Sequence, residues 1–433
     1  MLRPHILVLI AHDLGRHLGC YGRGVTTPAI DRLANQGALL ERAFAAAPQC
    51  SPSRAALNSG LWPHRTGMLG LAHLGWSMRP EVPKLPELLA AAGYRTALVG
   101  LEHEGVGCMS DHGYQEIVEA GSNRAEEVAA RAVEFIRDSV HPQGRRAFAS
   151  IGFEECHRPF PESRGGVPRL RPPPAHLPDL PEVRRDLAGL DESARRLDAG
   201  VGRVLAELDR RNLDAETLVV FTTDHGIAFP RAKGTLLESG LETALIMRLP
   251  GVVRAGLTSD ALVGNVDVLP TLCELAGAAV PAGIDGRGFL PVARGQARGH
   301  RERLFAEMTW HDAYAPQRAV RTGRHKLIRR FGPEGPAYVP LDVYASPSGR
   351  AVRSQRGPDP NSAPREELYD LAADPAETEN LAADPAHASL VEGLRTEMER
   401  WMAQSGDPLL VGPVPGRESP EWAQLRASQS GDL

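Results

Sequence analysis

The run His5-Ile6-Leu7-Val8-Leu9-Ile10 decides the fold class, together with Ala11-His12-Asp13, which follow it directly. A continuous apolar run that ends in polar residues predicts a strand buried on both faces, as in a mostly parallel sheet. Similar runs follow at Thr96–Val99, Phe148–Phe153 and Leu218–Thr223. The sequence therefore predicts a sheet of buried strands.

Helical stretches lie between these runs. They are predicted at Pro28–Gln36, Leu85–Ala92, Arg124–Ser139 and Ser193–Arg211. Gly37 closes the first stretch and Gly93 the second, each as a C-cap glycine. Strands that alternate with helices indicate an α/β fold, with a mostly parallel sheet between layers of helices.

The composition shifts near Pro291–Arg303, after which short strands are predicted at Leu304–Glu307, Arg318–Arg321 and His325–Ile328. We therefore expect a catalytic domain over residues 1–300. A smaller C-terminal α+β subdomain with short antiparallel strands would span residues 301–411, and a polar tail residues 412–433. Two segments rich in Pro, Gly, Arg or Ser are expected to be long irregular loops, Arg158–Pro181 and Gly332–Pro364.

Composition excludes several classes of protein. The 433-residue chain has a formal charge of -5, so nothing suggests the concentrated basic face of a nucleic-acid-binding protein. No stretch approaches the roughly 18 uninterrupted apolar residues of a membrane-spanning helix. The segment Met1–Pro4 before the first strand is too short for a signal peptide and has no small-residue cleavage site. We expect a soluble, cytoplasmic protein.

The cysteine pattern predicts neither a disulfide framework nor a thiolate metal site. The five are odd in number, widely spaced and without a CxxC pair, which argues against both disulfide bonds and a thiolate zinc site. They are Cys20, Cys50, Cys108, Cys156 and Cys273. Each must be judged by its own surroundings.

Polar residues follow all four predicted strands of the sheet. They are His12 and Asp13, His103, His157, and Asp224 with His225. Taken singly, such a residue more often caps a helix or begins a turn. In a parallel sheet, however, the carboxyl ends of the strands converge on one crevice. Asp13, Asp224 and His225 together offer oxygen and imidazole ligands for a divalent metal.

The segment from Ala47 to Gly60 contains Cys50 immediately before a predicted helix. Ser51 suits the N-cap and Pro52 the first helical position, while Gly60 suits the C-cap. At a helix N-terminus the dipole and free N–H groups favour an anion and lower the pKa of a thiol. The alternative is a structural cysteine beside a capped helix.

At this point the sequence resembles the type I sulfatases of the alkaline-phosphatase superfamily. Their signature Cys-x-Pro-Ser-Arg is matched by Cys50, Pro52, Ser53 and Arg54. Further matches run along nearly the whole chain, at Leu18–Gly22, Thr27–Pro28, Pro63–Gly67, Phe221–Gly226 and Glu367–Leu371. The resemblance implies an alkaline-phosphatase-like α/β fold.

The resemblance also implies that a maturation enzyme oxidises Cys50 to formylglycine, whose hydrated aldehyde carries two hydroxyls. One hydroxyl would attack sulfur, and loss of the proton of the other would reform the aldehyde and expel sulfate. Arg54 would steady the formylglycine, and the metal would orient it and neutralise sulfate oxygens. The metal ligands would be His12, Asp13, residue 50, Asp224 and His225.

Three further roles follow from the same resemblance. His103 would deprotonate the remaining hydroxyl, and His157 would face the leaving group. Lys233 would contact sulfate and help the leaving atom depart. Imidazole suits such proton transfers near neutral pH.

Two residues depart from the family pattern. His12 stands where the family usually has aspartate, so the metal site would lose a negative charge and gain a nitrogen. Ca²⁺ remains the first expectation, with Mg²⁺, Mn²⁺ and Zn²⁺ as alternatives, unless His12 does not touch the metal. Leu101 stands where the family has a lysine that bridges sulfate and formylglycine, and leucine supplies no cation.

The segments Leu61–Leu71, Gly152–Arg158 and Gly226–Pro230 look most like those of heparan N-sulfatases, so the expected substrate is a sulfated small molecule or sugar. Arginines in the Arg158–Arg171 loop could bind a carboxylate or a second sulfate, because guanidinium groups match such oxygens. The other interpretation of this segment is an ordinary solvated loop.

Two other functions remain open. A phosphonate monoester or phosphodiester hydrolase of the same superfamily would use the same nucleophile, because sulfate and phosphate are both tetrahedral. A carbohydrate-binding protein that has lost catalysis would explain Leu101. Against the second stands the retention of the segment Cys50–Arg54 together with His103, His157 and Lys233. Comparing turnover of aryl sulfate, aryl sulfamate and phosphonate monoester would rank the hydrolases.

Overall fold

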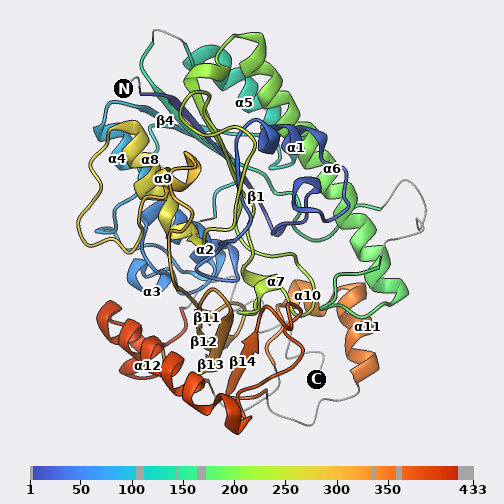
Figure 1. Ribbon diagram of the computed structural model, residues 1–433. Coiled ribbons are helices and arrows are strands. Elements are labelled where there is room, and N and C mark those ends of the chain that lie inside the picture. The colour runs from blue at the N-terminus through green and yellow to red at the C-terminus, as the bar shows by residue number, and fades with distance from the viewer. Residues whose placement is uncertain are drawn as a thin grey trace.

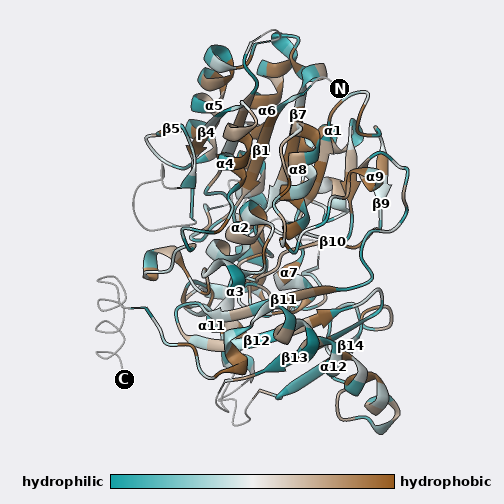
Figure 2. Ribbon diagram, turned by 90° about the vertical axis from the view of Figure 1, so that its left-hand side faces the viewer, coloured by the Kyte–Doolittle hydropathy of each residue, from teal (hydrophilic) through white to brown (hydrophobic). Residues whose placement is uncertain are grey.

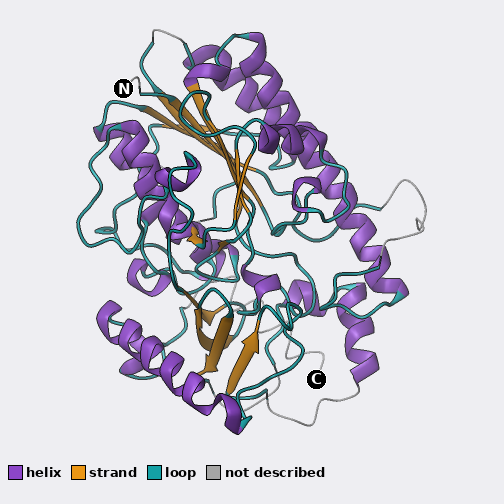
Figure 3. Cartoon of the chain, in the orientation of Figure 1, coloured by secondary structure: helices purple, strands orange, loops and turns teal. Residues whose placement is uncertain are grey.

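The computed structural model describes residues 3–103, 112–141, 144–162, 172–332, 337–356 and 363–417 (Figure 3). Its centre is a sheet in the order β5-β4-β6-β1-β7-β8-β2-β9. The strands of this sheet are β1 (His5–Ala11), β2 (Ala38–Leu40), β4 (Arg95–Gly100), β5 (Glu116–Val118), β6 (Ala147–Gly152), β7 (Thr217–Thr223), β8 (Leu245–Arg248) and β9 (Leu257–Ser259). Among the described strands of this sheet, β8 alone runs antiparallel to its neighbours. The predicted mostly parallel α/β sheet is confirmed.

Strand β1 shows why the sheet forms. All seven of its residues are buried, so both faces must be covered. Leu7 and Leu9 belong to one hydrophobic cluster, and Ile6, Val8 and Ile10 belong to another. Because alternate side chains of a strand point to opposite faces, β1 contributes to a core on each side of the sheet.

Helices cover both faces, as Figure 1 shows. The first cluster includes residues of α1 (Pro28–Asn35), α5 (Ala125–Ser139) and α6 (Pro181–Arg210). The second cluster includes residues of α2 (Cys50–Ser59), α4 (Leu85–Ala91), α8 (Val268–Ala276) and α9 (Leu290–Ala293). The predicted α/β layering is therefore correct.

Two local predictions need correction, and a third is confirmed. Helix α6 begins at Pro181, well before the predicted Ser193. Helix α2 begins at Cys50 with Gln49 as its N-cap, so Ser51 lies in the first turn, where its hydroxyl accepts the Ala72 N–H at 3.0 Å. Gly60 does close the helix in the left-handed region, with φ 69°.

The two predicted C-cap glycines differ from each other. Gly93 adopts φ 93°, as expected just beyond a helix end. Gly37 does not adopt a positive φ; a Cβ there would overlap the carbonyl oxygen of Met247 in the neighbouring strand β8. Glycine at position 37 is therefore required by close packing against the sheet, and the C-cap interpretation is wrong.

The C-terminal unit contains an antiparallel sheet in the order β11-β12-β13-β14, visible below the main sheet in Figure 2. Its strands are β11 (Leu304–Trp310), β12 (Tyr314–Arg321), β13 (His325–Arg330) and β14 (Glu366–Asp370). Helix α12 (Ala388–Ser405) packs beside it through the hydrophobic cluster that contains Leu327 and Met398. The predicted antiparallel C-terminal subdomain is thus present.

The predicted loop Gly332–Pro364 is wrong in part, because it contains α10 (Leu341–Tyr344) and α11 (Pro347–Arg356). The remaining short elements are α3 (Pro63–Thr66), α7 (Glu238–Leu241), β3 (Ala43–Phe44) and β10 (Val263–Gly264). In the described parts of the chain, none of the helices combines the length and apolarity that crossing a membrane requires.

Candidate active site

The carboxyl ends of four adjacent strands hold the polar residues that the sequence singled out. His12 and Asp13 follow β1, His103 follows β4, His157 follows β6, and Asp224 and His225 follow β7. These strands are hydrogen-bonded neighbours in the order β4-β6-β1-β7 and run parallel, so their ends meet at one edge.

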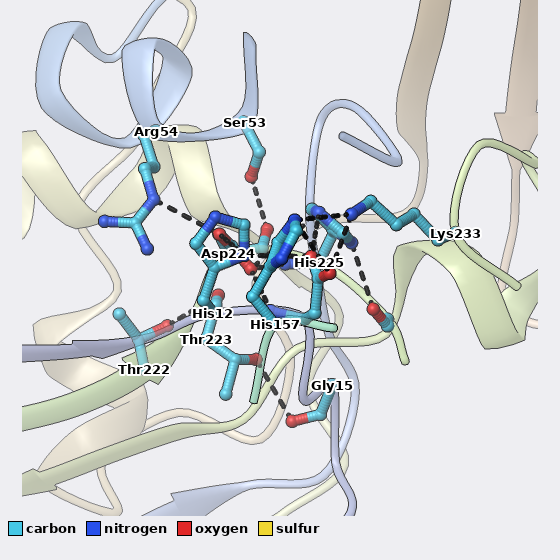
Figure 4. Close-up of polar contacts among 12 residues, drawn as sticks. His12, Gly15, Ser53, Arg54, His157, Thr222, Thr223, Asp224, His225 and Lys233 are labelled. Atoms are coloured by element: carbon cyan, nitrogen blue, oxygen red, sulfur yellow. Dashed lines mark hydrogen bonds and ion pairs between the residues drawn. The ribbon is translucent and has the colours of Figure 1, made fainter. Parts of the chain in front are cut away.

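The histidine rings gather around His12, as Figure 4 shows for His157 and His225. Ring centroids lie 4.8 Å from His12 to His157, 5.6 Å to His103 and 6.3 Å to His225. Residues far apart in sequence are thus brought into one compact group by the parallel topology.

His12, Asp13, Asp224 and His225 form a buried acid–imidazole cluster, in which the candidate ligand atoms all lie within 4.8 Å of one another. The Nδ1 atom of His12 is 2.9 Å from Asp13 Oδ1 and 3.4 Å from Asp224 Oδ2. The backbone N–H of Asp13 donates to Asp224 Oδ1 at 3.0 Å. Asp13 has φ 51°, a left-handed conformation that a non-glycine residue adopts only when its surroundings hold it there.

His225 supplies the observation that tests whether this cluster suits a metal. Its Nε2 atom is buried and lies 3.0 Å from Asp13 Oδ1, yet within the described parts of the chain it has no hydrogen-bond partner. Its Nδ1 atom faces the Gly226 carbonyl oxygen at 3.0 Å, which leaves Nε2 as the free lone pair when Nδ1 carries the proton. A lone pair directed at two carboxylates fits a shared cation, so the residues suit a divalent metal.

The charges of the cluster are tightly balanced. Burial alone would lower the pKa of His12 and of His225. Asp224 and Asp13 instead raise the pKa of His12 to about 9 and that of His225 to about 10. Burial would favour neutral Asp13, but Lys233 and His12 hold its pKa well below the usual range. The two carboxylates are therefore ionised and attract positive charge.

Cys50 lies in the first turn of α2, buried with only 3% exposure, and faces this cluster. Its Sγ and ring nitrogens of His12 and His103 lie within 4.8 Å of one another. Burial would raise the pKa of the Cys50 thiol, but His103, His12 and His225 hold it well below its ordinary value. The position therefore favours an anionic or strongly polarised group, in agreement with its place at a helix N-terminus.

The residues after Cys50 connect α2 to the end of β7 (Figure 4). The Ser53 hydroxyl donates to the backbone oxygen of Asp224, and Arg54 Nε donates to Asp224 Oδ2 at 3.2 Å. Arg54 Nη2 is buried and has no hydrogen-bond partner among the residues that the structure describes. Its free N–H groups are therefore available to a group at position 50 or to a ligand.

Asn265 is a buried residue of this region that sequence reasoning missed. Its side-chain amide donates to the Ser53 backbone oxygen at 2.9 Å, and its Oδ1 accepts the Ala46 N–H at 3.0 Å. It thereby fixes the chain on both sides of Cys50. No local pattern around Asn265 indicates this role, because its partners lie more than 200 residues away.

Lys233 and His157 also border the acid–imidazole cluster, beside Asp13. Lys233 Nζ donates to Asp13 Oδ2 at 2.7 Å and lies 3.4 Å from His157 Nε2. His157 Nδ1 donates to the carbonyl oxygen of Arg158 at 2.6 Å, which leaves Nε2 as the acceptor that faces the lysine. Burial, aided by the charge of Lys233, lowers the pKa of His157. Lys233 and His157 can therefore share one proton beside the cluster.

Two further residues complete the comparison with the sequence. Leu101, half-buried after β4, places no cation beside His103. Asp342 of α10, which sequence reasoning missed, accepts a second N–H of Lys233 at 2.8 Å through Oδ2. The C-terminal unit thus contributes a side chain to the candidate site.

The structure describes one of the arginines in the loop that the sequence suggests for substrate binding, Arg158. Arg158 is buried, with Nη1 2.9 Å from an oxygen of Asp186 and Nε donating to the Ala228 carbonyl oxygen at 2.7 Å. It holds α6 against the chain after β7, so its guanidinium is engaged within the protein; substrate binding by arginines of this loop stays a prediction. Arg164, Arg169 and Arg171 lie outside the described residues, as does Cys108. Cys20, Cys156 and Cys273 are free thiols.

Taken together, the fold and this site place a metal-type cluster, the N-terminus of α2 and a buried lysine at one edge of an α/β sheet. Comparison with known proteins makes the class specific. Residues 4–278 match the family model described as Sulfatase, and residues 229–348 match the one described as N-sulphoglucosamine sulphohydrolase, C-terminal. The chain therefore belongs to the sulfatase family and is a sulfuric ester hydrolase.

Individual relatives agree. Human N-sulphoglucosamine sulphohydrolase is 30% identical, over 95% of this chain and 92% of that protein. An ulvan-active sulfatase of Formosa agariphila is 27% identical, over 94% of this chain and 76% of that protein.

Solved structures show the same fold. A 2-O GAG sulfatase has a TM-score of 0.74 at 22% identity, covering 97% of this chain and 96% of its own. A protein in complex with its substrate D-glucosamine-2-N,6-O-disulfate has a TM-score of 0.73 at 19% identity, covering 94% and 98%. The predicted resemblance, fold and enzyme class are confirmed.

Proposed function

We propose that this protein removes sulfate from a sulfated sugar through a formylglycine made from Cys50, with nitrogen-linked sulfate as the leading substrate. The observation that carries the proposal is the place of Cys50, buried at the start of α2 and against the acid–imidazole cluster. The match of residues 229–348 to the C-terminal model of N-sulphoglucosamine sulphohydrolase supports nitrogen-linked sulfate.

The metal would be held by Asp13, Asp224, His225 and His12, together with the group at position 50. When bound, it supplies charge that neutralises sulfate oxygens and orients the nucleophile. Ca²⁺ is the first candidate from the family resemblance. The imidazoles in the cluster make Mg²⁺, Mn²⁺ and Zn²⁺ the alternatives.

The chain's own residues divide the remaining work. The formylglycine hydroxyl attacks sulfur, and Arg54, with its free N–H groups, steadies the group at position 50. His103, within reach of that group, takes the proton of the second hydroxyl so that sulfate can depart. Lys233 and His157 face each other at 3.4 Å and deliver a proton to the leaving atom.

The test uses protein isolated from its native host. Mass spectrometry of the peptide that contains Cys50 should show formylglycine, and metal analysis should show about one divalent ion per chain. Turnover of glucosamine N-sulfate and of an aryl sulfate should exceed turnover of a phosphonate monoester. Cys50→Ala should abolish turnover of the sulfated substrates while the protein stays folded. An unmodified thiol in active protein, or phosphonate turnover above both sulfates, would overturn the proposal.

A further inference from the structure

Asp342 reaches the site from the C-terminal unit. It lies in α10, whose first residue, Leu341, donates its N–H to Asp312 Oδ2 at 2.7 Å. The preceding Pro340 packs on Gly234, where φ is 76° and an added Cβ would lie 2.6 Å from the proline ring. Helix α10 is therefore packed directly against the backbone next to Lys233.

The contacts of Asp342 place its carboxylate on the side of Lys233 and His157. Oδ2 accepts from Lys233 Nζ at 2.8 Å and lies 4.0 Å from His157 Nε2. Oδ1 accepts the N–H of Val343 at 2.9 Å. A carboxylate has about four lone-pair positions, so acceptor capacity remains on both oxygens.

Exposure distinguishes Asp342 from the other carboxylate on Lys233. The Asp342 side chain is 23% exposed, whereas the side chains of Asp13 and Lys233 are 0% and 2% exposed. Lys233 Nζ uses its three N–H groups toward Asp13, Asp342 and the ring of His157. A substrate that reaches this pair therefore meets an ionised carboxylate beside the proton donor.

Elementary chemistry separates the two kinds of sulfate at this position. In a sulfamate, R–NH–SO₃⁻, the atom that leaves carries a hydrogen and can donate it to a carboxylate. In a sulfate ester, R–O–SO₃⁻, the atom that leaves carries only lone pairs, which a carboxylate repels. A carboxylate beside the leaving atom thus favours nitrogen and disfavours oxygen.

On the basis of the proposed function, we propose that Asp342 selects nitrogen-linked sulfate by accepting the N–H of the leaving nitrogen. In the reaction, the bond between sulfur and the attacking hydroxyl oxygen forms as the sulfur–nitrogen bond breaks, and the proton of that hydroxyl passes to water. The nitrogen keeps its own hydrogen, takes one proton from the Lys233–His157 pair and leaves as a neutral amine. Asp342 orients that nitrogen and holds Lys233 in place.

The test compares Asp342→Asn with the unchanged enzyme on glucosamine N-sulfate and on N-acetylglucosamine 6-O-sulfate. Asparagine keeps the size of the side chain and removes its charge. The ratio of kcat/KM for the N-sulfate to that for the O-sulfate should fall roughly 10- to 100-fold, as expected for a hydrogen bond to a charged group. Asp312→Asn is the matched control, since it loosens α10 without removing a contact of Lys233. It should lower kcat/KM for both substrates by the same factor.

A binding measurement keeps the inference separate from the proposed function. In Cys50→Ala protein, calorimetry should show tighter binding of the N-sulfate than of the O-sulfate, and the preference should disappear in Cys50→Ala/Asp342→Asn. Equal effects of Asp342→Asn on both substrates, or no binding preference in Cys50→Ala, would overturn the inference while leaving sulfatase activity intact. A preference that depends on Asp342, in an enzyme that turns over no sulfate, would instead overturn the proposed function.

Discussion

The buried histidines of this protein differ in charge because their partners differ. In His5, Nδ1 accepts the Ala147 N–H at 3.1 Å, and Nε2 donates to the His141 carbonyl oxygen at 3.1 Å. Burial, aided by Arg146, lowers the pKa of His5 to about 4. His5 is therefore neutral near pH 7, whereas the two carboxylates beside His12 and His225 raise the pKa of these rings to about 9 and about 10.

This arrangement predicts a pH dependence of stability from His5. Its pKa is lower in the folded protein than the ordinary 6.5, so below pH 6.5 the unfolded chain binds more protons. The stabilisation is complete above pH 6.5 and is lost as pH falls toward 4. Between pH 7 and pH 5, the difference in unfolding free energy between the unchanged protein and His5→Asn should shrink by about 2 kcal/mol.

Urea unfolding at the two pH values measures this difference. Asn can still accept the Ala147 N–H through its amide oxygen but does not titrate, so the comparison isolates the imidazole. A difference that stays constant between pH 7 and pH 5 would show that His5 can be protonated in the folded protein at little cost.

At the scale of elements, the turn after β7 depends on close contact with α7. The N–H of Gly226 donates to the Gly240 carbonyl oxygen at 3.0 Å, and a Cβ on Gly226 would overlap the carbonyl oxygen of Ser239. Only glycine lets the two segments approach this closely. The same turn carries Asp224 and His225, so its position sets the geometry of the acid–imidazole cluster.

Gly226→Ala should therefore destabilise the protein by about 2 kcal/mol and reduce its bound metal, because the turn must move away from α7. Gly393→Ala is the matched control: it lies in α12 with open space around the added methyl and should be neutral or stabilising by up to about 1 kcal/mol. Thermal unfolding and metal analysis of both variants measure the effects. Equal stability and full metal content in both would refute the role of this contact.

The features that can be predicted from the sequence are those that local sequence determines. Each long central strand of the sheet is a mostly apolar run; His12 and Asp224 follow their strands directly, and His103 and His157 follow a few residues further on. Given a parallel sheet, their meeting point follows from topology alone. The family motif added Arg54 and Lys233, which the structure places around the same centre; their catalytic roles remain proposals.

The features that the sequence did not predict depend on contacts between distant segments. Asp342 lies in a segment rich in Pro, Gly and Ser, and it reaches the site only because α10 packs on Gly234. The place of Gly37 after a helix predicts a C-cap, but its packing on β8 determines the residue. Local sequence carries no record of such partners, so only the assembled fold reveals them.

At the scale of the whole molecule, a buried polar network joins the two units. The N–H of His64, in the family segment Pro63–Gly67, donates to Glu307 Oε1 at 2.9 Å. Arg318 Nη2 lies 3.4 Å from Glu307 Oε2 and donates to Asp407 Oδ1 at 2.9 Å. All four of these side chains are buried, so helix α3, the C-terminal sheet and the chain after α12 share one set of charges.

Arg318→Leu should destabilise the protein by about 3–5 kcal/mol, because Glu307 and Asp407 would remain buried without their cation. Since Glu307 also holds His64, the loss should loosen the junction and separate thermal unfolding into two transitions. Arg329→Leu, which removes the ion pair with 53%-exposed Glu399, should cost less than about 1 kcal/mol.

Calorimetry of both variants measures the two losses of stability. Sulfatase activity after mild heating is an independent measure of whether the two units have separated. Because Asp342 enters the site from the C-terminal unit, a loosened junction should inactivate the enzyme at a lower temperature than that at which the main sheet melts. Loss of activity and melting of the sheet at one temperature in Arg318→Leu would mean that the two units remain coupled through their apolar contacts alone.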